Sequence, residues 1–287
     1  MAKVAAWAAA WVAAGADVRD HGRTSDRAQG MRQMRLAKAI RLLPRCWGDN
    51  SLLKRRGFIL LCSHMRARTT LLSHIVGSHP SVCGYAELHQ KLRGWPDLLE
   101  LSAKAEDASG KFAAGRHVLD KIVHDLPIRR KVLDRDDTSI VIMVRDPVQT
   151  IRSILEIKSG GIDDLDGACE YYASRLASLR DLIEHRQGRA FYMDSEALVA
   201  RTAETLAALG GYLGIAPGLS EDYRLFKHTG RPKYGDISKK IMAGRIVRVE
   251  DTAQPAFANA HRLQEMRRIH ESFRQFARAN TRHHVFA

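Results

Sequence analysis

Two arginines and two threonines stand together where a phosphate group could bind. They belong to the segment Arg66-Ala67-Arg68-Thr69-Thr70. Before it, Gly57–Cys62 is the continuous apolar run expected of a central parallel strand, and Thr69–Gly77 has the pattern of a helix that ends before Pro80. The free N–H groups and the dipole of a helix N-terminus favour an anion, and arginine and hydroxyl side chains add charge-assisted donors. The sequence therefore predicts an anion-binding loop between a strand and a helix.

The same loop lacks the parts of a nucleotide-hydrolysing P-loop. Such a loop needs a Gly-Lys-Ser/Thr triplet, whose hydroxyl holds magnesium. The chain has one Gly-Lys pair, Gly110-Lys111, and it is followed by Phe112. We therefore expect the chain to hold an anionic nucleotide without a metal ion.

A second group of polar residues follows the clearest strand of the sequence. Thr138–Val144 is rich in β-branched residues, and Pro147 suits the first position of a helix with Asp146 as its N-cap. Arg145 leaves the strand and Ser153 lies about two turns into the helix. Both are expected at the carboxyl edge of a parallel sheet, where open α/β sheets bind ligands. A guanidinium with a hydroxyl suits a phosphate; an Arg145–Asp146 pair that only caps the helix is the alternative.

The two groups together resemble the cofactor site of sulfotransferases that use 3′-phosphoadenosine-5′-phosphosulfate (PAPS). In that family a strand–loop–helix of type Arg/Lys-Ser-Gly-Thr-Thr cradles the 5′-phosphosulfate. An Arg followed by a Ser eight residues later, in an Arg-Asp-Pro context, binds the 3′-phosphate. Arg66–Thr70 is similar to the first motif, and Arg145 and Ser153 keep the eight-residue interval of the second. The resemblance runs from Gly57 to Arg248 and implies PAPS as the sulfuryl donor, with no metal.

Further segments resemble the same family in chain order. Gly77–Glu87 is similar to the segment that carries a catalytic Glu in tyrosylprotein-type and many bacterial members. Asp120–His124 resembles the strand end that supplies a catalytic Lys, with a His just beyond it in cytosolic members. The resemblance therefore implies three catalytic residues, Glu87, Lys121 and His124, with Glu87 or His124 as the base. It also implies three more cofactor contacts, namely Tyr192 near adenine and Ser238 and Lys239 in a late loop that closes over the cofactor.

The first loop departs from the family pattern at two positions. Ala67 stands where Ser is usual and removes one hydroxyl donor, and Arg68 stands where Gly is usual. Gly reaches φ > 0 freely, so we expect Arg68 to adopt φ < 0 or the loop to take a different shape. The Arg68 charge is then available to contact the sulfate. A sulfotransferase-like protein that binds the nucleotide without turnover is one alternative function.

Helical and strand patterns alternate along the chain, which predicts a parallel sheet covered on both faces. With the resemblance, this implies an α/β protein with a P-loop-like three-layer α/β/α fold, in which helices flank a central parallel sheet. Residues 31–287 are expected to form a single domain. Residues 1–30 are expected to be an export signal, a surface tail or an overlong start before Met31. Further helices are predicted at Met31–Leu43, Leu98–Ala114, Asp164–Gln187, Glu196–Leu213 and Phe257–Ala279, and further strands at His117–Val123 and Arg189–Met193.

Charge and cysteine content narrow the possible functions. A formal net charge of +14 over 287 residues favours anionic partners in general. No basic motif interleaved with aromatic residues is visible, so we expect no specific nucleic acid, and peripheral membrane contact stays open. The four cysteines form no CxxC pair and no zinc-type spacing, which predicts a reducing, cytoplasmic location without disulfides or metal.

The predicted function is transfer of a sulfuryl group from PAPS to a hydroxyl or amine. The acceptor is a small molecule, a carbohydrate or a lipid, and the oligomeric state stays open. A P-loop kinase is a rival that needs the absent triplet. A basic protein that binds nucleic acid or membranes is a second rival, supported only by the charge.

Overall fold

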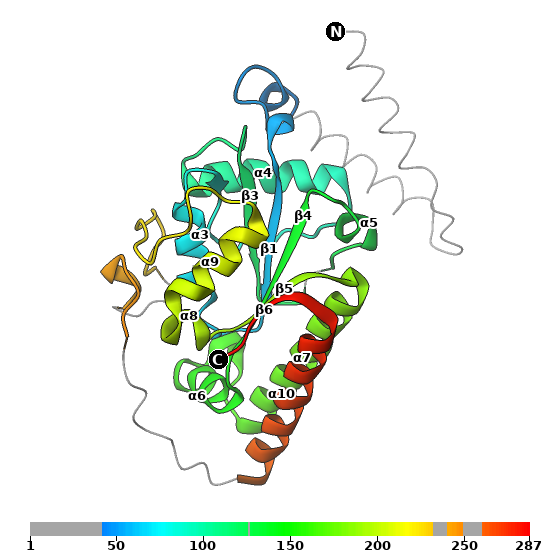
Figure 1. Cartoon of the computed structure of the whole chain (residues 1–287), viewed down its shortest axis with the longest axis vertical. Coiled ribbons are helices and arrows are strands. Elements are labelled where there is room, and N and C mark those ends of the chain that lie inside the picture. The colour runs from blue at the N-terminus through cyan, green and yellow to red at the C-terminus, as the bar shows by residue number, and fades with distance from the viewer. Residues whose placement is uncertain (1–41, 126, 232–239, 249–259) are drawn as a thin grey trace, which may run out of the picture.

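The computed structural model describes residues 42–125, 127–231, 240–248 and 260–287, and within them six strands form one parallel sheet between layers of helices (Figure 1). The strand order across the sheet is β2-β3-β1-β4-β5-β6. This is the three-layer α/β/α architecture that the sequence predicts. The strands are β1 (Gly57–Ser63), β2 (Val82–Cys83), β3 (His117–Ile122), β4 (Thr138–Val144), β5 (Gly188–Asp194) and β6 (Thr281–Val285).

Helices cover both faces of the sheet, because successive residues of the central strands are apolar and point to opposite sides. In β1, Phe58 and Leu60 belong to one core cluster, while Ile59 and Leu61 belong to the other. The first cluster receives α4 (Trp95–Ser109), α6 (Pro147–Ile157), α7 (Leu165–Arg186) and α10 (Ala260–Asn280). The second receives α3 (Thr69–Ser78), α8 (Ala197–Ala200) and α9 (Thr202–Leu213).

Short elements complete the described chain. The α-helical turn α5 (Arg130–Leu133) lies between β3 and β4, and four 3₁₀ helices are η1 (Leu43–Cys46), η2 (Leu52–Lys54), η3 (Ser159–Gly161) and η4 (Ile241–Ala243). No helix within the described ranges is long and apolar enough to cross a membrane.

The strand order separates the loops that follow β1 and β4 at the carboxyl edge of the sheet. β1 pairs with both β3 and β4, and the chain leaves β1 toward β2 but leaves β4 toward β5, on the opposite side of the sheet. The loops after β1 and β4 therefore diverge, which is the switch point where open α/β sheets bind ligands. Both of the predicted phosphate-binding groups lie in these two loops.

Several predicted elements agree closely with the structure. Thr138–Val144 is strand β4, and α6 begins at Pro147 with Asp146 as its N-cap, whose carboxylate accepts a hydrogen bond from the Gln149 N–H. The helix predicted over Glu196–Leu213 is instead two helices, because Arg201 between them leaves helical geometry at φ −129° and ψ 50°.

One predicted helix had the wrong boundaries, and one strand was not predicted. The helix predicted over Leu98–Ala114 is α4, which begins at Trp95 and ends before Gly110 in the left-handed region. Strand β6 was not predicted, and its three middle residues are exposed at the sheet edge. The segment 1–30 and nearly all of the predicted Met31–Leu43 helix lie outside the described residues.

Candidate functional site

The loop after β1 contains two arginines in the left-handed region of backbone conformation. Arg66 has φ 63° and Arg68 has φ 61°. The expectation that Arg68 avoids φ > 0 was wrong: Arg68 itself takes the conformation that glycine adopts most easily. A non-glycine residue there costs on the order of 1 kcal/mol. The backbone shape favoured by glycine is therefore kept, although the glycine is absent.

Helix α3 begins directly after this loop without a side-chain cap. Arg68 occupies the N-cap position and makes no side-chain capping hydrogen bond. The first N–H groups of a helix need external partners, and a left-handed residue followed by helical ones arranges successive N–H groups around a concave site that suits an anion. Thr69 and Thr70 are the first two residues of α3 and are buried, so the start of the helix lies below the protein surface.

Three residues of the two loops and of α6 contact one another, and we call them the anion clamp: Arg66, Arg145 and Ser153. Arg66 Nε donates to Ser153 Oγ at 2.9 Å, and one terminal nitrogen of Arg145 donates to the Arg66 carbonyl oxygen at 3.0 Å. Arg145 also donates to Gln149 Oε1 through two nitrogens, at 2.9 and 3.1 Å. The loops after β1 and β4 are thereby joined by the residues whose spacing suggested a common ligand. The alternative Arg145–Asp146 capping pair does not describe these contacts.

Arg68 contacts two residues that follow β5. Its guanidinium donates to Ser195 Oγ at 3.1 Å and to Glu196 Oε1 at 3.2 Å. Glu196 Oε1 also lies 3.9 Å from Arg145 Nε. The Arg68 charge is thus directed at a carboxylate, whereas the sequence suggested a contact with sulfate. Ala67 is fully buried.

A second group, which we call the acid–base cluster, consists of Glu87, Lys121, His124 and His89. Lys121 Nζ lies 3.6 Å from Glu87 Oε2 and 3.5 Å from the hydroxyl of Thr70 in α3. Burial lowers the pKa of Lys121, and the charge of Glu87 opposes that shift. The lysine therefore links the predicted anion loop to the predicted base.

The other carboxylate oxygen of Glu87 faces two histidines. Oε1 lies 3.6 Å from His124 Nε2 and 3.7 Å from His89 Nδ1, and the two imidazole rings stack with centroids 6.1 Å apart. Oε1 is itself buried and makes no hydrogen bond within the described part of the chain. His89 has φ 48°, a strained conformation of the kind that clusters at functional sites. One carboxylate thus lies between a buried ammonium and two half-exposed imidazoles.

Backbone contacts on both sides of Glu87 fix it to the end of β3. The Lys121 N–H donates to the Ala86 carbonyl at 3.3 Å, and the Leu88 N–H donates to Asp120 Oδ1 at 3.0 Å. Asp120 is fully buried. Burial, aided by the charge of Glu87, raises its pKa to about 7 against the opposing Leu88 hydrogen bond.

Close packing of two glycines allows this attachment. A Cβ on Gly84 would lie 2.3 Å from the Leu119 carbonyl oxygen, and one on Gly77 would lie 2.5 Å from the Gly84 carbonyl oxygen. Any larger residue at either position would push the segment that carries Glu87 away from β3 or α3. The two glycines therefore contribute to the position of the carboxylate.

Sequence reasoning missed His64, which is fully buried where β1 ends. Its Nδ1 lies 2.8 Å from the Met65 carbonyl, and its Nε2 accepts a hydrogen bond from the Arg145 N–H at 3.0 Å. Gln149 and Glu196, which contact the guanidinium of Arg145, were also missed. A polar residue at the end of an apolar strand was the only signal for His64, because its partner Arg145, which follows β4, is 81 residues away.

One of the other predicted cofactor contacts lies in the core, and two lie outside the described residues. Tyr192 is fully buried, its ring lies near Phe273 and Phe286, and its hydroxyl donates to Asp194 at 2.6 Å. Its contact with adenine stays a prediction. Ser238 and Lys239 lie outside the described residues.

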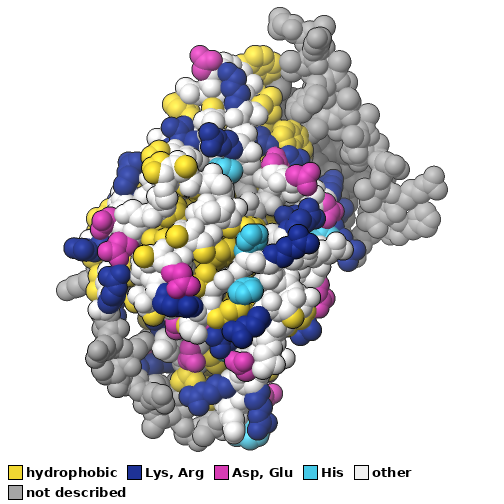
Figure 2. Space-filling view, viewed as in Figure 1, with side chains coloured by type: hydrophobic (Ala, Val, Ile, Leu, Met, Phe, Trp, Pro, Cys, Tyr) yellow, Lys and Arg dark blue, Asp and Glu magenta, His cyan; other side chains and the backbone are white. Residues whose placement is uncertain are grey.

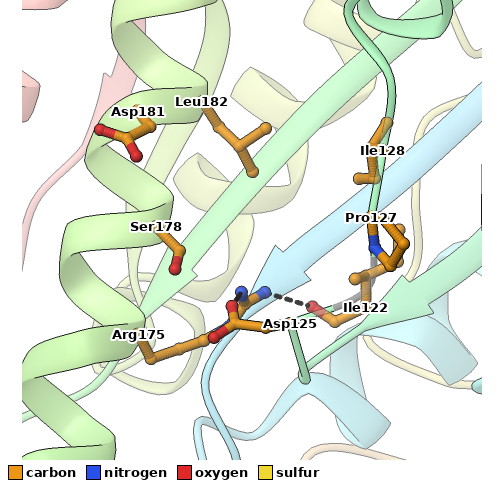
Figure 3. A pocket seen from close by; sticks show the side chains of 8 residues that line it. All are labelled: Ile122, Asp125, Pro127, Ile128, Arg175, Ser178, Asp181 and Leu182. Atoms are coloured by element: carbon orange, nitrogen blue, oxygen red, sulfur yellow. Dashed lines mark hydrogen bonds and ion pairs between the residues drawn. The ribbon is translucent and has the colours of Figure 1, made fainter. Parts of the chain in front are cut away.

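A cavity of about 350 Å³ lies beside the segment that follows His124. It is lined on one side by α7 and on the other by the chain after β3 (Figure 3). Arg175 of α7 extends into this region, where it pairs with Asp125 and donates to the carbonyl oxygens of Ser63 and Ile122. Its guanidinium therefore ties α7 to the carboxyl ends of β1 and β3. No residue of the anion clamp or the acid–base cluster lines the cavity.

No family model and no curated protein matches this sequence. A solved structure, the sulfotransferase domain from the Synechococcus PCC 7002 olefin synthase, matches with a TM-score of 0.52 and 16% identity. The match covers 77% of this chain and 96% of that domain. The chain has the fold of a sulfotransferase domain. A sulfotransferase from Alicyclobacillus acidocaldarius matches more distantly, with a TM-score of 0.43, 11% identity and coverage of 78% of this chain and 94% of that one.

The residues at the carboxyl ends of β1, β3 and β4 suit an anionic ligand. The uncapped turn of α3 and Lys121 lie on one side, and Arg145 with Ser153 lies on the other. A guanidinium fork recognises phosphate through two hydrogen bonds. In the described ranges no three His, Cys, Asp or Glu side chains are arranged to hold a metal ion.

Proposed function

We propose that this protein transfers a sulfuryl group from PAPS to a hydroxyl or amine of a small molecule, a carbohydrate or a lipid. The observation that supports it most is that two loops converge at the carboxyl edge of the sheet. The Arg66–Ser153 and Arg145–Arg66 contacts join the loops after β1 and β4, and Lys121 connects the first loop to Glu87. The sulfotransferase fold agrees with this proposal.

The anion clamp and the start of α3 would hold the nucleotide. The 5′-phosphosulfate belongs beside the first N–H groups of α3, with Arg66 and Lys121 near it, and the 3′-phosphate belongs beside Arg145 and Ser153. Both clamp arginines already have a neutral acceptor within the protein, Ser153 Oγ for Arg66 and Gln149 Oε1 for Arg145. A phosphate oxygen would replace that acceptor at little cost, because a guanidinium bonds a charged acceptor more strongly than a neutral one.

The acid–base cluster would carry out the transfer. As the acceptor atom forms a bond to sulfur, Glu87 Oε1 takes its proton. The bond between sulfur and the bridging 5′-phosphate oxygen breaks, and the electron pair stays on that oxygen, where the Lys121 ammonium stabilises it. A transferring sulfuryl group carries less negative charge than a phosphoryl group, so positive side chains and N–H groups suffice where phosphoryl transfer recruits magnesium.

Glu87 is preferred over His124 as the base. Its carboxylate lies directly beside Lys121, with its Oε1 free of hydrogen bonds among the described residues, whereas the His124 side chain is 42% exposed. A base must come within hydrogen-bond reach of the proton that it removes. Glu87 is closer to the position that the sulfuryl group would occupy between Lys121 and the start of α3.

One alternative has a specific observation in its favour. Because the Arg68 guanidinium pairs with Glu196 and bonds Ser195, its charge is already matched within the protein, so a nucleotide-binding protein without turnover is the second candidate. Basic and acidic side chains are intermixed over the face shown in Figure 2. That face therefore has no single basic surface of the kind that a nucleic-acid or membrane role would need.

We place the protein in the cytoplasm because its four cysteines are free thiols.

The test combines binding with turnover. Purified protein is titrated with adenosine 3′,5′-bisphosphate in a thermal-shift experiment, and is incubated with PAPS carrying labelled sulfur and a panel of sugars, lipids and phenols. We expect stabilisation by the bisphosphate and labelled product with at least one acceptor class. No thermal shift at millimolar bisphosphate would overturn the nucleotide assignment, and a shift without product over a broad panel would favour the binding protein. Magnesium-dependent ATP turnover would instead support a kinase.

A further inference from the structure

Arg145 is held through its backbone as well as through its side chain. Its N–H donates to His64 Nε2 at 3.0 Å, and its carbonyl oxygen accepts a hydrogen bond from the Tyr172 hydroxyl at 2.9 Å. His64 and Tyr172 are both fully buried. The peptide groups on the two sides of the Arg145 Cα therefore each have one buried side-chain partner.

His64 also connects Arg145 to the loop that carries Arg66. Its Nδ1 donates to the Met65 carbonyl at 2.8 Å, one residue before Arg66. Because Nε2 accepts a hydrogen bond, the ring proton is on Nδ1. Burial, helped by the nearby charges of His270, Arg145 and Arg175, lowers the pKa of His64 to about 3 against the opposing Met65 hydrogen bond, so the ring stays neutral and keeps this hydrogen-bonding pattern.

Tyr172 forms the second attachment and extends it to the last helix. Its hydroxyl lies 2.8 Å from His270 Nδ1 in α10, and its ring meets the His64 ring edge to face at 5.0 Å. The single hydroxyl proton goes to the Arg145 carbonyl, so His270 donates to the hydroxyl oxygen. The series His270–Tyr172–Arg145–His64–Met65 thus crosses from α10 through α7 to the ends of β4 and β1.

We propose that His64 and Tyr172 are positioning residues that fix the distance between Arg145 and the loop that carries Arg66. The site then prefers a nucleotide with phosphates at both the 3′ and 5′ positions over one with a 5′-phosphate alone. This inference rests on the proposed function. A displacement of about 1 Å at Arg145 would weaken a 3′-phosphate contact, but it would leave the 5′-phosphate at the start of α3 unaffected. The preference for two phosphates is therefore the sensitive property.

The experiment measures that preference as the ratio of two dissociation constants, for adenosine 5′-monophosphate over adenosine 3′,5′-bisphosphate, by calorimetric titration. His64→Asn keeps an amide near the Met65 carbonyl but is too short to reach the Arg145 N–H. His64→Gln offers an acceptor at the distance of Nε2. Tyr172→Phe removes only the hydroxyl.

We expect the ratio to fall about tenfold in His64→Asn, since one hydrogen bond is worth about that factor. We expect a fall of about fivefold in Tyr172→Phe, and recovery to within about threefold of the native ratio in His64→Gln.

Two matched controls lie outside the clamp. His79 is a buried histidine whose Nδ1 accepts from the Ser81 N–H and whose Nε2 donates to the Pro217 carbonyl, and the Tyr212 hydroxyl bonds the Ile140 and Arg189 carbonyls. His79→Asn and Tyr212→Phe should lower the melting temperature comparably but leave the ratio unchanged.

The outcomes separate this inference from the proposed function. An unchanged ratio in folded His64→Asn and in Tyr172→Phe overturns the positioning role, and if His64→Asn does not fold, Tyr172→Phe decides alone. A fall of the same size in the control variants also overturns it, because general destabilisation would then explain the result. If Arg145→Ala itself leaves the ratio unchanged, the clamp assignment within the proposed function fails instead.

Discussion

In the anion clamp, arginine nitrogens and their acceptors are 2.9 to 3.1 Å apart, whereas the contacts within the acid–base cluster are 3.6 to 3.7 Å long. The clamp side chains are oriented by complete hydrogen bonds before any ligand arrives. The cluster groups are near each other but are not hydrogen-bonded at short range. Binding groups benefit from a fixed orientation, while groups that exchange a proton with a substrate need room for it.

The largest expected effect is on Lys121, which joins the two regions. Lys121→Met removes the charge beside the leaving oxygen, and we expect kcat for sulfuryl transfer to fall about 10²- to 10³-fold, the usual effect of losing one such group. Steady-state rates with saturating PAPS measure it. Lys54→Met, at an exposed lysine paired with Asp49, should not change kcat. A fall of less than threefold in Lys121→Met would remove Lys121 from the chemistry.

Glu87→Gln tests which member of the cluster is the base. The amide keeps the shape but cannot take a proton, so we expect kcat to fall about 10²-fold or more, with the bisphosphate dissociation constant changed by less than about threefold. His124→Asn is made beside it and should reduce kcat less. If His124→Asn lowers kcat more than Glu87→Gln does, the base is His124 and not Glu87.

Arg145→Ala tests whether the short contacts of the clamp indicate binding. Because its guanidinium is fixed beside Arg66 and Ser153, its removal should weaken binding of adenosine 3′,5′-bisphosphate more than about tenfold. Calorimetric titration gives the dissociation constants. Arg180→Ala, at a residue of α7 that stacks on Phe276, is the matched control and should bind normally. An unchanged affinity in Arg145→Ala would mean that the clamp is only structural.

The smallest expected effect concerns stability beneath the acid–base cluster. The pKa of Asp120 is raised from 3.8 to about 7, chiefly by burial, so the folded protein holds a proton that the unfolded chain releases above about pH 4. Its favourable contribution is complete below that pH and is lost as the pH rises toward 7. Asp120→Asn keeps an acceptor for the Leu88 N–H but does not titrate.

Urea unfolding at pH 5 and pH 8 measures this difference. The free energy of unfolding of Asp120→Asn, relative to the native protein, should be higher at pH 8 than at pH 5. The same relative value at both pH values would show that Asp120 is ionised in the folded state throughout. The nearby charges of Glu87 and Lys121 are present in both proteins, so they do not produce the difference.

Local sequence signals predicted some elements almost to the residue. β4 was found because a β-branched run has one strong preference, and the start of α6 was found because proline and an N-cap aspartate act within one turn. β6 was missed because Arg282, His283 and His284 are polar residues exposed on an edge strand, and only pairing with β5 makes this segment a strand.

The candidate site divides in the same way. The resemblance in spacing supplied Arg66, Arg145, Ser153, Glu87, Lys121 and His124, and the structure brings these residues into two adjoining groups. It could not supply His64, Gln149 or Glu196 as their partners, nor the core position of Tyr192, whose place on the strand directs the ring into the first cluster. Similarity along the chain gives the order of motifs but not which face of a strand a side chain occupies at its end.

By itself the sequence determined which segments are buried strands and which polar residues follow them, because periodicity and capping act over a few neighbouring residues. Only the tertiary structure decided that β1 lies between β3 and β4. That order places Arg66 beside Ser153 and Lys121 beside Glu87. Strand pairing joins residues that are far apart in the chain and depends on the packing of both sheet faces, so no local pattern encodes it.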